Sequence, residues 1–421
     1  MADPSPDLVS LPPVAGRAAP LRRIAAALAF PNFRKLWFGA ATSSIGTWMQ
    51  SVAQNWLVLT LSGSAFYLGL DAFLAQLPIL LFTLIGGVVA DRYDRRRVLL
   101  GSQYVQMTTA FTLAVLVGTG AVRVWQILAL SFVTGCAQAF GGPAHQSLMP
   151  SLVDRERLPN AIALNSIQFN LARVIGPLLA GLALASLGMV FCFTANGVSF
   201  LAVIAALWTL KVPPREEAAP PLPLAQDLRI GLRYVRREGP LFGLTLLAFA
   251  VTFLGTPLLT LLPVFAQNVF HLGVEGYSRM MVFSGAGAVT GAITVAWLGR
   301  FPRMGTWALA IQVLFGGLIV AFALARVPAL SHLLLFAAGA ALIIVFSLMN
   351  SLVQLIAPNH MRGRVMSIYM MAFRGGMPLG SLASGYLANR LSAPTALVIN
   401  GILLVVVAAV FLVRFEKLRS V

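Results

Sequence analysis

A dense run of charges interrupts an otherwise apolar stretch of this chain. Six of the seven residues from Asp91 to Arg97 are charged, and long apolar runs at 66–90 and 98–116 lie on either side. Ionised side chains are costly inside hydrocarbon, so this run must lie at a water-facing surface and end both apolar runs there. Four of the six charges are arginines, which favours the cytoplasmic side of a membrane. We therefore expect a chain that crosses a bilayer repeatedly.

The composition of the whole chain favours the same conclusion. Hydrophobic residues make up 58% and charged residues only 10%, whereas soluble domains average about 45–50% and about 25%. A net charge of +17 could attract nucleic acid. The basic residues lie in short loops between apolar runs, however, so we interpret them as topology signals and expect no nucleic-acid partner.

Twelve apolar stretches of membrane-spanning length follow one another along the chain. The predicted spans are 36–61, 66–90, 98–119, 124–147, 160–186, 190–210, 241–266, 277–298, 305–325, 329–354, 365–389 and 394–413. The predicted fold is therefore an all-α integral membrane protein with twelve transmembrane helices in two pseudo-symmetric six-helix bundles. The predicted domains are a cytoplasmic tail, a first bundle, a linker, a second bundle and a short cytoplasmic tail, at 1–35, 36–210, 211–240, 241–413 and 414–421.

The basic residues separate the two sides of the membrane. Loops and tails on one side hold 24 of the 30 lysines and arginines, loops on the other side hold four, and Arg173 and Arg374 lie within spans. Basic residues accumulate in cytoplasmic loops, so this bias predicts that both termini are cytoplasmic. No cleavable signal peptide is predicted. The expected location is a bacterial-type cytoplasmic (inner) membrane.

Two further patterns support the division into halves. In the linker, Leu228 and Leu232 recur at helical spacing opposite several arginines, which predicts an amphipathic helix on the anionic inner leaflet. An internal repeat relates the halves, because 146–150 matches 354–358 at a separation of 208 residues, as Arg92 matches Arg300. Such repeats are typical of duplicated transporter scaffolds.

Segments of the chain resemble the major facilitator superfamily. The run 87–97 is similar to the signature that follows the second helix of that family, Gly-x-x-x-Asp-Arg-x-Gly-x-Arg-Arg, with Asp94 in place of the second glycine. The segment 176–181 resembles the Gly-Pro-x-x-Gly-Gly element of the fifth helix, which is typical of exporters. The segments 158–161 and 350–367 resemble the twelve-helix drug and siderophore exporters, a subgroup that includes macrolide and enterobactin exporters.

This resemblance implies an exporter that rocks between inward-open and outward-open states, driven by protons. It also implies a conformational lock on the inner side, formed by Gly87, Asp91, Arg92 and Arg96. The alternative for the lock is a simple topology marker. The arginine common in the fourth helix of proton-coupled drug exporters has no counterpart here, because Ser131 and Thr134 occupy that region.

Three ionisable residues lie well inside predicted spans. Asp71 is either a proton carrier or a hydrated residue near the outer mouth that holds a neighbouring helix end. Arg173 either grips an anionic or phenolic group of the substrate or hydrogen-bonds to carbonyls of neighbouring helices, and Arg374 has the same two alternatives. Intramembrane charges usually face a cavity or a partner.

Polar side chains at helical spacing mark several other spans. They predict either a shared substrate path or ordinary hydrogen bonding between helices. The candidate cavity residues are Gln50, Gln54, Asn170, Arg173, Thr252, Thr256, Asn350, Gln354 and Arg374. The four histidines and two cysteines are scattered, so neither a metal site nor a cofactor is expected.

The favoured function is export of an amphipathic small organic molecule, drug-like or siderophore-like, by alternating access with proton antiport. Two arginines against one aspartate in the spans favour anionic, phenolic or neutral cargo. No nucleotide-binding motif is present, so ATP is not the expected fuel. The alternatives are a non-transporting membrane sensor on the same scaffold and a lipid-modifying enzyme, which would need a cluster of catalytic groups. We expect a monomer that is not an enzyme, with the substrate, protons and the lipid bilayer as its partners.

Overall fold

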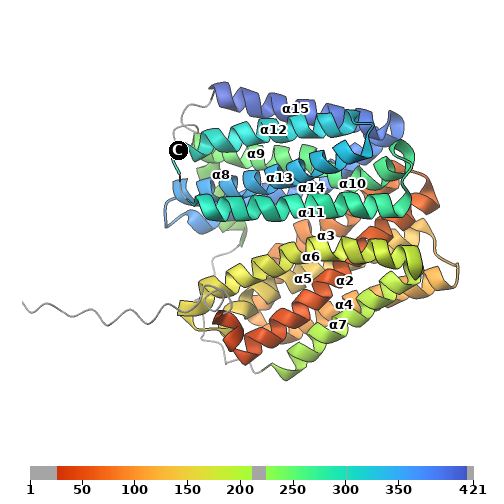
Figure 1. The fold of residues 1–421 in the computed structure, drawn as a ribbon. Coiled ribbons are helices and arrows are strands. Elements are labelled where there is room, and N and C mark those ends of the chain that lie inside the picture. The colour runs from red at the N-terminus through yellow and green to blue at the C-terminus, as the bar shows by residue number, and fades with distance from the viewer. Residues whose placement is uncertain (1–25, 211–223, 300, 415–421) are drawn as a thin grey trace, which may run out of the picture.

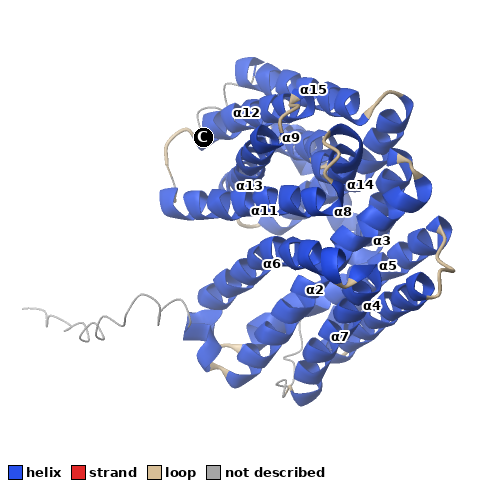
Figure 2. Ribbon diagram, turned by 45° about the vertical axis from the view of Figure 1, so that its right-hand side comes forward, coloured by secondary structure: helices blue, strands red, loops and turns tan. Residues whose placement is uncertain are grey.

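The computed structural model describes residues 26–210, 224–299 and 301–414. Within these ranges the regular elements are all helices, joined by short loops (Figure 2). The predicted cytoplasmic tails lie mostly outside the described residues, as does the first part of the predicted linker. The prediction of an all-α fold is confirmed for the part that is described.

The N-terminal half consists of six long helices that pack as one bundle, drawn in red to yellow-green in Figure 1. Its long helices are α2 (Pro31–Ser62), α3 (Ala65–Arg92), α4 (Arg95–Gly118), α5 (Val124–Leu148), α6 (Leu158–Ser186) and α7 (Gly188–Thr209). Short 3₁₀ turns accompany them at η1 (Ala26–Ala29), η2 (Met149–Leu152) and η3 (Arg155–Arg157).

The C-terminal half forms a second bundle, drawn above the first in Figure 1. Its elements are α9 (Gly239–Gly255), α10 (Pro257–Val264), η4 (Phe265–Val269), α11 (Gly273–Leu298), α12 (Met304–Leu324), α13 (Pro328–Ile356), α14 (Arg362–Arg390) and α15 (Ala393–Arg414). The amphipathic helix α8 (Leu224–Arg237) precedes this bundle and packs against α14 and α9. Its Val235 is buried, whereas Arg229, Arg233, Arg236 and Arg237 are exposed.

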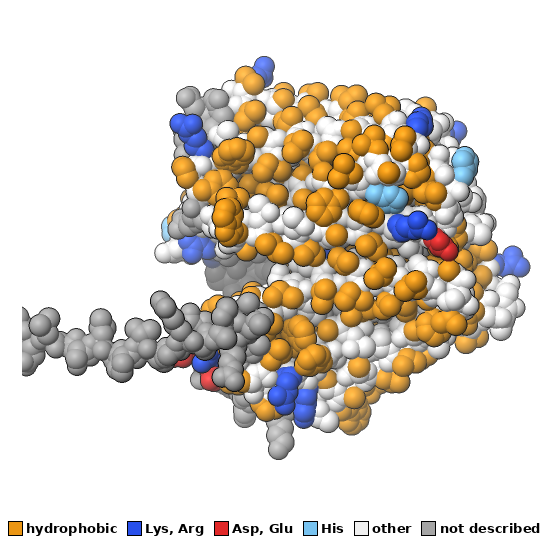
Figure 3. Space-filling view, in the orientation of Figure 1, with side chains coloured by type: hydrophobic (Ala, Val, Ile, Leu, Met, Phe, Trp, Pro, Cys, Tyr) orange, Lys and Arg blue, Asp and Glu red, His pale blue; other side chains and the backbone are white. Residues whose placement is uncertain are grey.

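Nine helical segments of the described chain are long and apolar enough to cross a membrane. Three more, α2, α4 and α14, are of similar length but carry more polar residues. The total is consistent with the predicted twelve spans. Hydrophobic side chains are spread over the visible flank of both bundles in Figure 3, and the charged side chains lie mainly toward its ends, as expected for helices that face lipid.

The seventh predicted span is not one continuous helix. Residues 239–269 form α9, α10 and the π-helical η4 in succession, with the break at Thr256–Pro257. Proline lacks a backbone N–H and clashes with the preceding turn, so Pro257 interrupts the helix. Pro263 lies within α10, shortly before the π-helical turn. The hydropathy of the sequence identifies the apolar stretch but does not indicate whether its helix is continuous.

Helices also extend beyond the predicted spans. The first begins at Pro31 rather than near residue 36, and it carries Arg34 and Lys35 in its first turns. Hydropathy marks the part of a helix that lies in hydrocarbon, and a helix continues past that boundary into the headgroup region. A proline at the first helical position starts α2, because its missing N–H would be unpaired there anyway.

Contacts between the halves concentrate at one end of the molecule. We call the end that carries residues 91–97 the basic end, and the other the opposite end. Near the opposite end, Ser64 Oγ donates to Asn389 Oδ1 at 2.8 Å. In the same region a Cβ atom added to Gly385 of α14 would lie 2.8 Å from the Ala65 carbonyl oxygen and 2.9 Å from Gly69 Cα. Only glycine permits the helix backbones to come this close.

A second contact between the halves joins α6 and α11. A Cβ atom on Gly181 would lie 2.9 Å from the Ser278 Cβ atom, and one on Gly285 would lie 2.8 Å from the Arg173 carbonyl oxygen. The helices of the two halves diverge from these contacts toward the left of Figure 1. The interface is therefore formed by close-packed glycines from the middle of the membrane to the opposite end.

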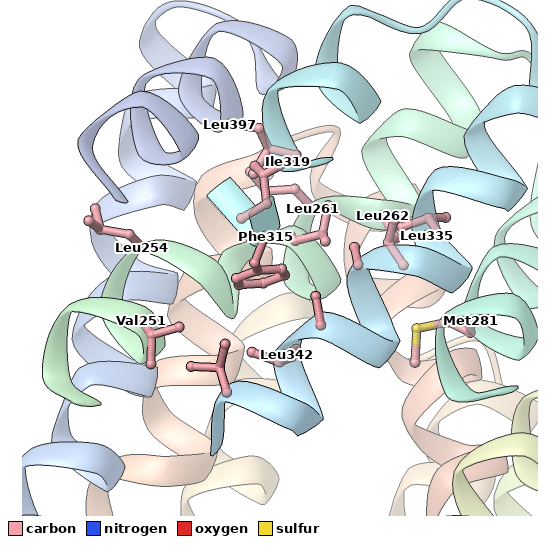
Figure 4. Close-up of a cluster of buried hydrophobic side chains, with 14 of the residues drawn as sticks. Val251, Leu254, Leu261, Leu262, Met281, Phe315, Ile319, Leu335, Leu342 and Leu397 are labelled. Carbon is pink, nitrogen blue, oxygen red and sulfur yellow. The ribbon is translucent and has the colours of Figure 1, made fainter. Parts of the chain in front are cut away.

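The core of the C-terminal half is apolar. Phe315 of α12 is fully buried, and Leu261, Leu262 and Leu335 surround it from other helices (Figure 4). One polar exception is Gln312, one turn before Gly316, whose amide nitrogen and oxygen are both buried without a hydrogen-bond partner in the described part of the chain.

We predict that Gly385→Leu destabilises the folded protein. The new side chain would collide with backbone atoms of α3, and such overpacking costs about 1–3 kcal/mol. Thermal unfolding in detergent should show a lower midpoint than wild type. Gly317→Leu is the matched control, because a Cβ atom there meets nothing within 4 Å. Equal midpoints for both variants would contradict the close packing of α3 and α14.

Candidate functional site

Asp71 of α3 is the one acidic side chain among the buried residues of the described chain. Its side chain is 3% exposed. Ser131 Oγ of α5 donates to Asp71 Oδ1 at 2.5 Å, and Gln54 Nε2 of α2 donates to Asp71 Oδ2 at 2.9 Å. Gln54 Nε2 also lies 2.9 Å from Ser131 Oγ. Three helices thus meet at a carboxyl group whose hydrogen-bond partners are both uncharged.

A chain of hydrogen bonds continues from this group toward the basic end along α2. Gln50 Nε2 approaches Gln54 Oε1 at 3.5 Å, and Asn196 Nδ2 of α7 donates to Gln50 Oε1 at 2.6 Å. Ser199 Oγ then contacts Asn196 Oδ1 at 3.2 Å. The polar stripe on α2 that the sequence indicated is therefore a link between α3, α5 and α7. Gln50 and Gln54 are both half-buried within it.

Arg173 of α6 is half-buried and faces an aromatic ring. Its guanidinium carbon lies 5.6 Å from the centroid of the Trp48 ring. Phe169 packs edge-to-face on the same tryptophan, with the ring centroids 6.2 Å apart. A cation over an indole face is attracted by the ring quadrupole. Within the described residues the Arg173 side chain has no ion pair or hydrogen bond, so its donors remain available.

The other predicted site residues of α6 and of the C-terminal half are spread over three further environments. Asn170 donates to the Ser166 carbonyl of its own helix at 2.9 Å. On α13, Gln354 Nε2 approaches Asn350 Oδ1 at 3.4 Å. Arg374 of α14 is exposed. These side chains do not join the hydrogen-bonded chain on α2.

Thr252 and Thr256 bond to their own helix. Thr252 is fully buried and donates to the Ala248 carbonyl at 2.9 Å, and Thr256 donates to the Thr252 carbonyl at 2.5 Å. A Cβ atom on Gly376 of α14 would collide with the Thr252 hydroxyl. The surroundings of Thr252 thus correspond to close packing of α9 and α14.

A cavity of about 520 Å³ lies inside the N-terminal half toward the basic end. We call it the amide cavity, because six of its lining residues carry amide side chains. These are Gln103, Gln106, Gln138, Gln146, Asn165 and Gln168. Ser43, Thr47 and Trp48 of α2 complete one wall. None of the predicted site residues lines it.

The sequence did contain a signal for this cavity. Gln103 and Gln106 recur on α4, and Gln138 and Gln146 on α5, at spacings that place each pair near one helix face. A polar side chain within a membrane span usually faces the bundle interior. Neutral amides also hydrogen-bond between helices in ordinary packing, so the sequence alone does not distinguish these residues as the lining of a cavity.

The charged loop is braced within its own half. Asp94 accepts from the backbone N–H of Arg96 at 2.9 Å and so caps α4. Arg96 Nη2 donates to the Trp208 carbonyl of α7 at 2.7 Å, and Arg95 Nη1 donates to the Ser147 carbonyl of α5 at 2.9 Å. Asp91 and Arg92 are exposed at the end of α3. These bonds fix the ends of α4, α5 and α7 relative to one another.

A contact near the opposite end joins α2 directly to the C-terminal half. Asn55 Nδ2 donates to the Tyr277 hydroxyl of α11 at 3.1 Å. Trp56 stacks on the same tyrosine, with ring centroids 6.4 Å apart. Tyr277 is fully buried. A second cavity of about 830 Å³, lined by residues of both halves such as Gly63 and Asn389, lies at this end.

Among the described residues no three histidine, cysteine, aspartate or glutamate side chains gather as they would around a metal ion. Two bundles of long apolar helices, a glycine-packed interface and a polar path through one bundle define a helical membrane transporter. Residues 23–420 match the model of a protein family that is described as transmembrane secretion effector. It belongs to this family of the major facilitator superfamily, and it is an efflux transporter rather than an enzyme.

Relatives and solved structures agree with this placement. The chain is 28% identical to the staphyloferrin A transporter of Staphylococcus aureus, over 89% of this chain and 94% of that protein. It is also 28% identical to the multidrug efflux pump Tap of Mycolicibacterium fortuitum, over 90% and 95%. Its fold resembles that of a bacterial homologue of the lysosomal transporter Spinster, with a TM-score of 0.73, 16% identity, and coverage of 96% and 99%.

Replacing Asn196 by leucine should destabilise the N-terminal half. The substitution leaves Gln50 Oε1 without its donor in a partly buried position, and an unsatisfied buried polar group costs about 1–3 kcal/mol. Asn170→Leu is the control, because Asn170 bonds only to its own helix. Thermal unfolding of both variants in detergent would measure the difference. A smaller loss of stability for Asn196→Leu than for Asn170→Leu would contradict the proposed bracing of α2 by α7.

Proposed function

We propose that this protein exports an amphipathic small organic molecule by alternating access, with protons as the counter-ion. The observation that carries the proposal is the enclosed carboxyl group of Asp71, whose hydrogen-bond partners are Ser131 and Gln54. The relatives named above, a siderophore transporter and a multidrug efflux pump, support drug-like or siderophore-like cargo.

Asp71 is suited to carry a proton because of what surrounds it. In the described part of the chain it forms no ion pair. A carboxylate enclosed without a cation can lose its charge only by taking up a proton. Ser131 and Gln54 lie on two other helices, so a change in the charge of Asp71 changes the hydrogen bonds that hold α2, α3 and α5 together. Proton binding would thereby bias the arrangement of helices.

The interface between the halves supports alternating access. The halves meet through glycines and the Asn55–Tyr277 bond in the middle and toward the opposite end, where residues of both halves also line the cavity of about 830 Å³. Their helices diverge toward the basic end (Figure 1). An arrangement joined at one end and diverging toward the other supports one of the two states that such a cycle requires. The second state would separate Asn55 from Tyr277 and bring the basic ends of the halves together.

The direction of transport follows from the proposed orientation. The strong bias of arginines and lysines supports a cytoplasmic location for the basic end and both termini, in a bacterial inner membrane. Substrate would enter from that side and leave at the opposite end. One charge crossing 100 mV releases about 2.3 kcal/mol, and a tenfold gradient of a neutral solute costs about 1.4 kcal/mol. One proton can therefore sustain more than a tenfold gradient of a neutral solute. We propose that a single chain carries out this cycle as a monomer.

The charged loop would lock the closed state at the basic end. Gly87, Asp91 and Arg92 lie in the last turns of α3, and Arg96 in the first turn of α4 is held by its bond to the Trp208 carbonyl of α7. An exposed Asp91 and Arg92 at the end of α3 are placed where a swing of the C-terminal half would meet them. Their role as a lock is part of this proposal.

Asp71→Asn is expected to abolish proton-driven export while the protein still folds. Asparagine has the shape of aspartate and can keep one of the two hydrogen bonds, but it cannot bind and release a proton. Everted vesicles should accumulate substrate on energisation with wild type, and an uncoupler should stop this. The variant should accumulate at least about tenfold less substrate, whereas Glu275→Gln, which alters an exposed carboxylate, should match wild type. Uncoupler-sensitive export by Asp71→Asn at the wild-type rate would refute Asp71 as the carrier.

Arg173→Gln tests the second charged group. If Arg173 holds an anionic or phenolic part of the cargo, the variant should lose transport of such compounds by about tenfold or more, because a charged hydrogen bond contributes about 1.5–3 kcal/mol. Transport of neutral compounds should change less, and thermal unfolding should stay near that of wild type. Arg279→Gln, at an exposed site on α11, is the control. Unchanged export of anionic compounds would remove Arg173 from the substrate site.

A further inference from the structure

We infer that the amide cavity of the N-terminal half is a binding subsite for an uncharged, oxygen-rich part of the cargo, one that carries hydroxyl and carbonyl groups. This inference rests on the proposed export function and adds a location and a chemical class to it. All the residues that line it belong to the N-terminal half, and of the charged candidates Arg173 adjoins it through Trp48.

Five helices of one bundle line the cavity, which opens to the surface beside the exposed Gln146 and Phe169. Its walls come from α2, α4, α5, α6 and α7, and its volume is about 520 Å³. Pockets for small organic molecules span roughly 300–1,000 Å³. The cavity is therefore large enough for a substantial part of a drug-sized molecule.

The charge of the lining selects the class of ligand. The lining contains no aspartate, glutamate, lysine or arginine, and its one side chain that can become charged near neutral pH is that of His145. A formal charge on the ligand would find no opposite charge there, and burying it would be costly. Amides carry both N–H donors and carbonyl acceptors. They can therefore donate to the carbonyl groups of a ligand, and they can donate to or accept from its hydroxyl groups.

Some of these amides already form hydrogen bonds within the protein. Gln168 Nε2 donates to Ser44 Oγ at 2.7 Å, and Gln138 Nε2 donates to Gln106 Oε1 at 3.0 Å. Gln106 Nε2 is bonded to Ser102 Oγ at 3.1 Å. These bonds hold the walls together, as they would in a purely structural network.

Other polar groups of the lining form no hydrogen bond to the described residues. Gln103, Gln146, Asn165 and His145 have no hydrogen-bond partner in the described part of the chain. They come from α4, α5 and α6, so they face the cavity from three sides. Gln146 is exposed, whereas Gln103 and Asn165 are half-buried. Half-buried amides without partners favour a ligand or water that satisfies them. This set distinguishes a binding cavity from simple helix packing.

An apolar and cationic edge adjoins the amides. Trp48 and Phe169 line the cavity and pack edge-to-face. Arg173 lies on Trp48, with its guanidinium carbon 5.6 Å from the ring centroid. A ring or alkyl part of the cargo can lie on Trp48 while its oxygen atoms bond to the amides. The cavity and its edge thus suit an amphipathic molecule.

Gly142 provides a way to fill the cavity without disturbing the fold. It lines the cavity, and a Cβ atom there meets nothing within 4 Å. Gly142→Leu should therefore occupy the cavity with little strain. Gly317→Leu is the matched control, since Gly317 is exposed on α12 of the other half and is equally open. Gln103→Leu removes one uncommitted amide and keeps a side chain of similar size.

The test is equilibrium binding to the purified full chain in lipid nanodiscs. The probes are radiolabelled chloramphenicol, which is neutral and carries hydroxyl and amide groups, and tetraphenylphosphonium, a cation without oxygen. We expect chloramphenicol to bind wild type and Gly317→Leu equally, and Gly142→Leu and Gln103→Leu about tenfold or more weakly. Any binding of tetraphenylphosphonium should be the same in all four proteins. Thermal unfolding would verify that each variant is folded.

Two outcomes would overturn the inference. One is that chloramphenicol fails to bind the wild-type chain, and the other is that it binds folded Gly142→Leu as tightly as wild type. Binding at equilibrium needs no gradient, so these outcomes are independent of proton coupling. Uncoupler-insensitive export by wild type, together with the expected binding pattern, would instead reject the proposed energy source and leave the subsite standing.

Discussion

The structure depends on the cost of placing an unpaired charge in hydrocarbon. That cost drives nearly all basic residues to the helix ends, where Asp94 caps α4 and Arg96 reaches the end of α7. Within the described residues it leaves one buried carboxyl group, that of Asp71, which accepts hydrogen bonds from Gln54 and Ser131. Several polar contacts that remain in the interior, such as those of Gln54 and Asn196, join different helices and fix how they pack. The fold and the candidate site therefore have the same physical origin.

Much of the fold could be predicted from the sequence, because hydropathy distinguishes the segments that lie in lipid from those that face water. The all-α fold of apolar helices and the position of 91–97 between two of them follow from charge and apolar length alone, and the helices found are consistent with the predicted count of twelve. The position of Asp71 as an isolated intramembrane acid could be predicted in the same way. The break at Pro257 could not, because an apolar run of the right length looks the same whether its helix is continuous or interrupted.

The partners of the site residues were less accessible to prediction. Gln54 and Ser131 are 77 residues apart in the chain and share Asp71 only because three helices pack together. The amide cavity is a still stronger case, because Gln103 and Asn165 face the same space from helices that are not neighbours in sequence. Periodicity gives the face of each helix but leaves open which faces meet.

The two halves differ in how their interiors are held together, and this difference bears on how they could move. Hydrogen bonds between side chains of different helices brace the N-terminal half, whereas apolar packing around residues such as Phe315 holds much of the C-terminal half. Between the halves, glycine contacts and bonds such as Asn55–Tyr277 form the junction. A neutral hydrogen bond contributes only about 0.5–1.5 kcal/mol net. Opening this junction therefore costs far less than unfolding either bundle, which is the energetic condition that rigid-body rocking requires.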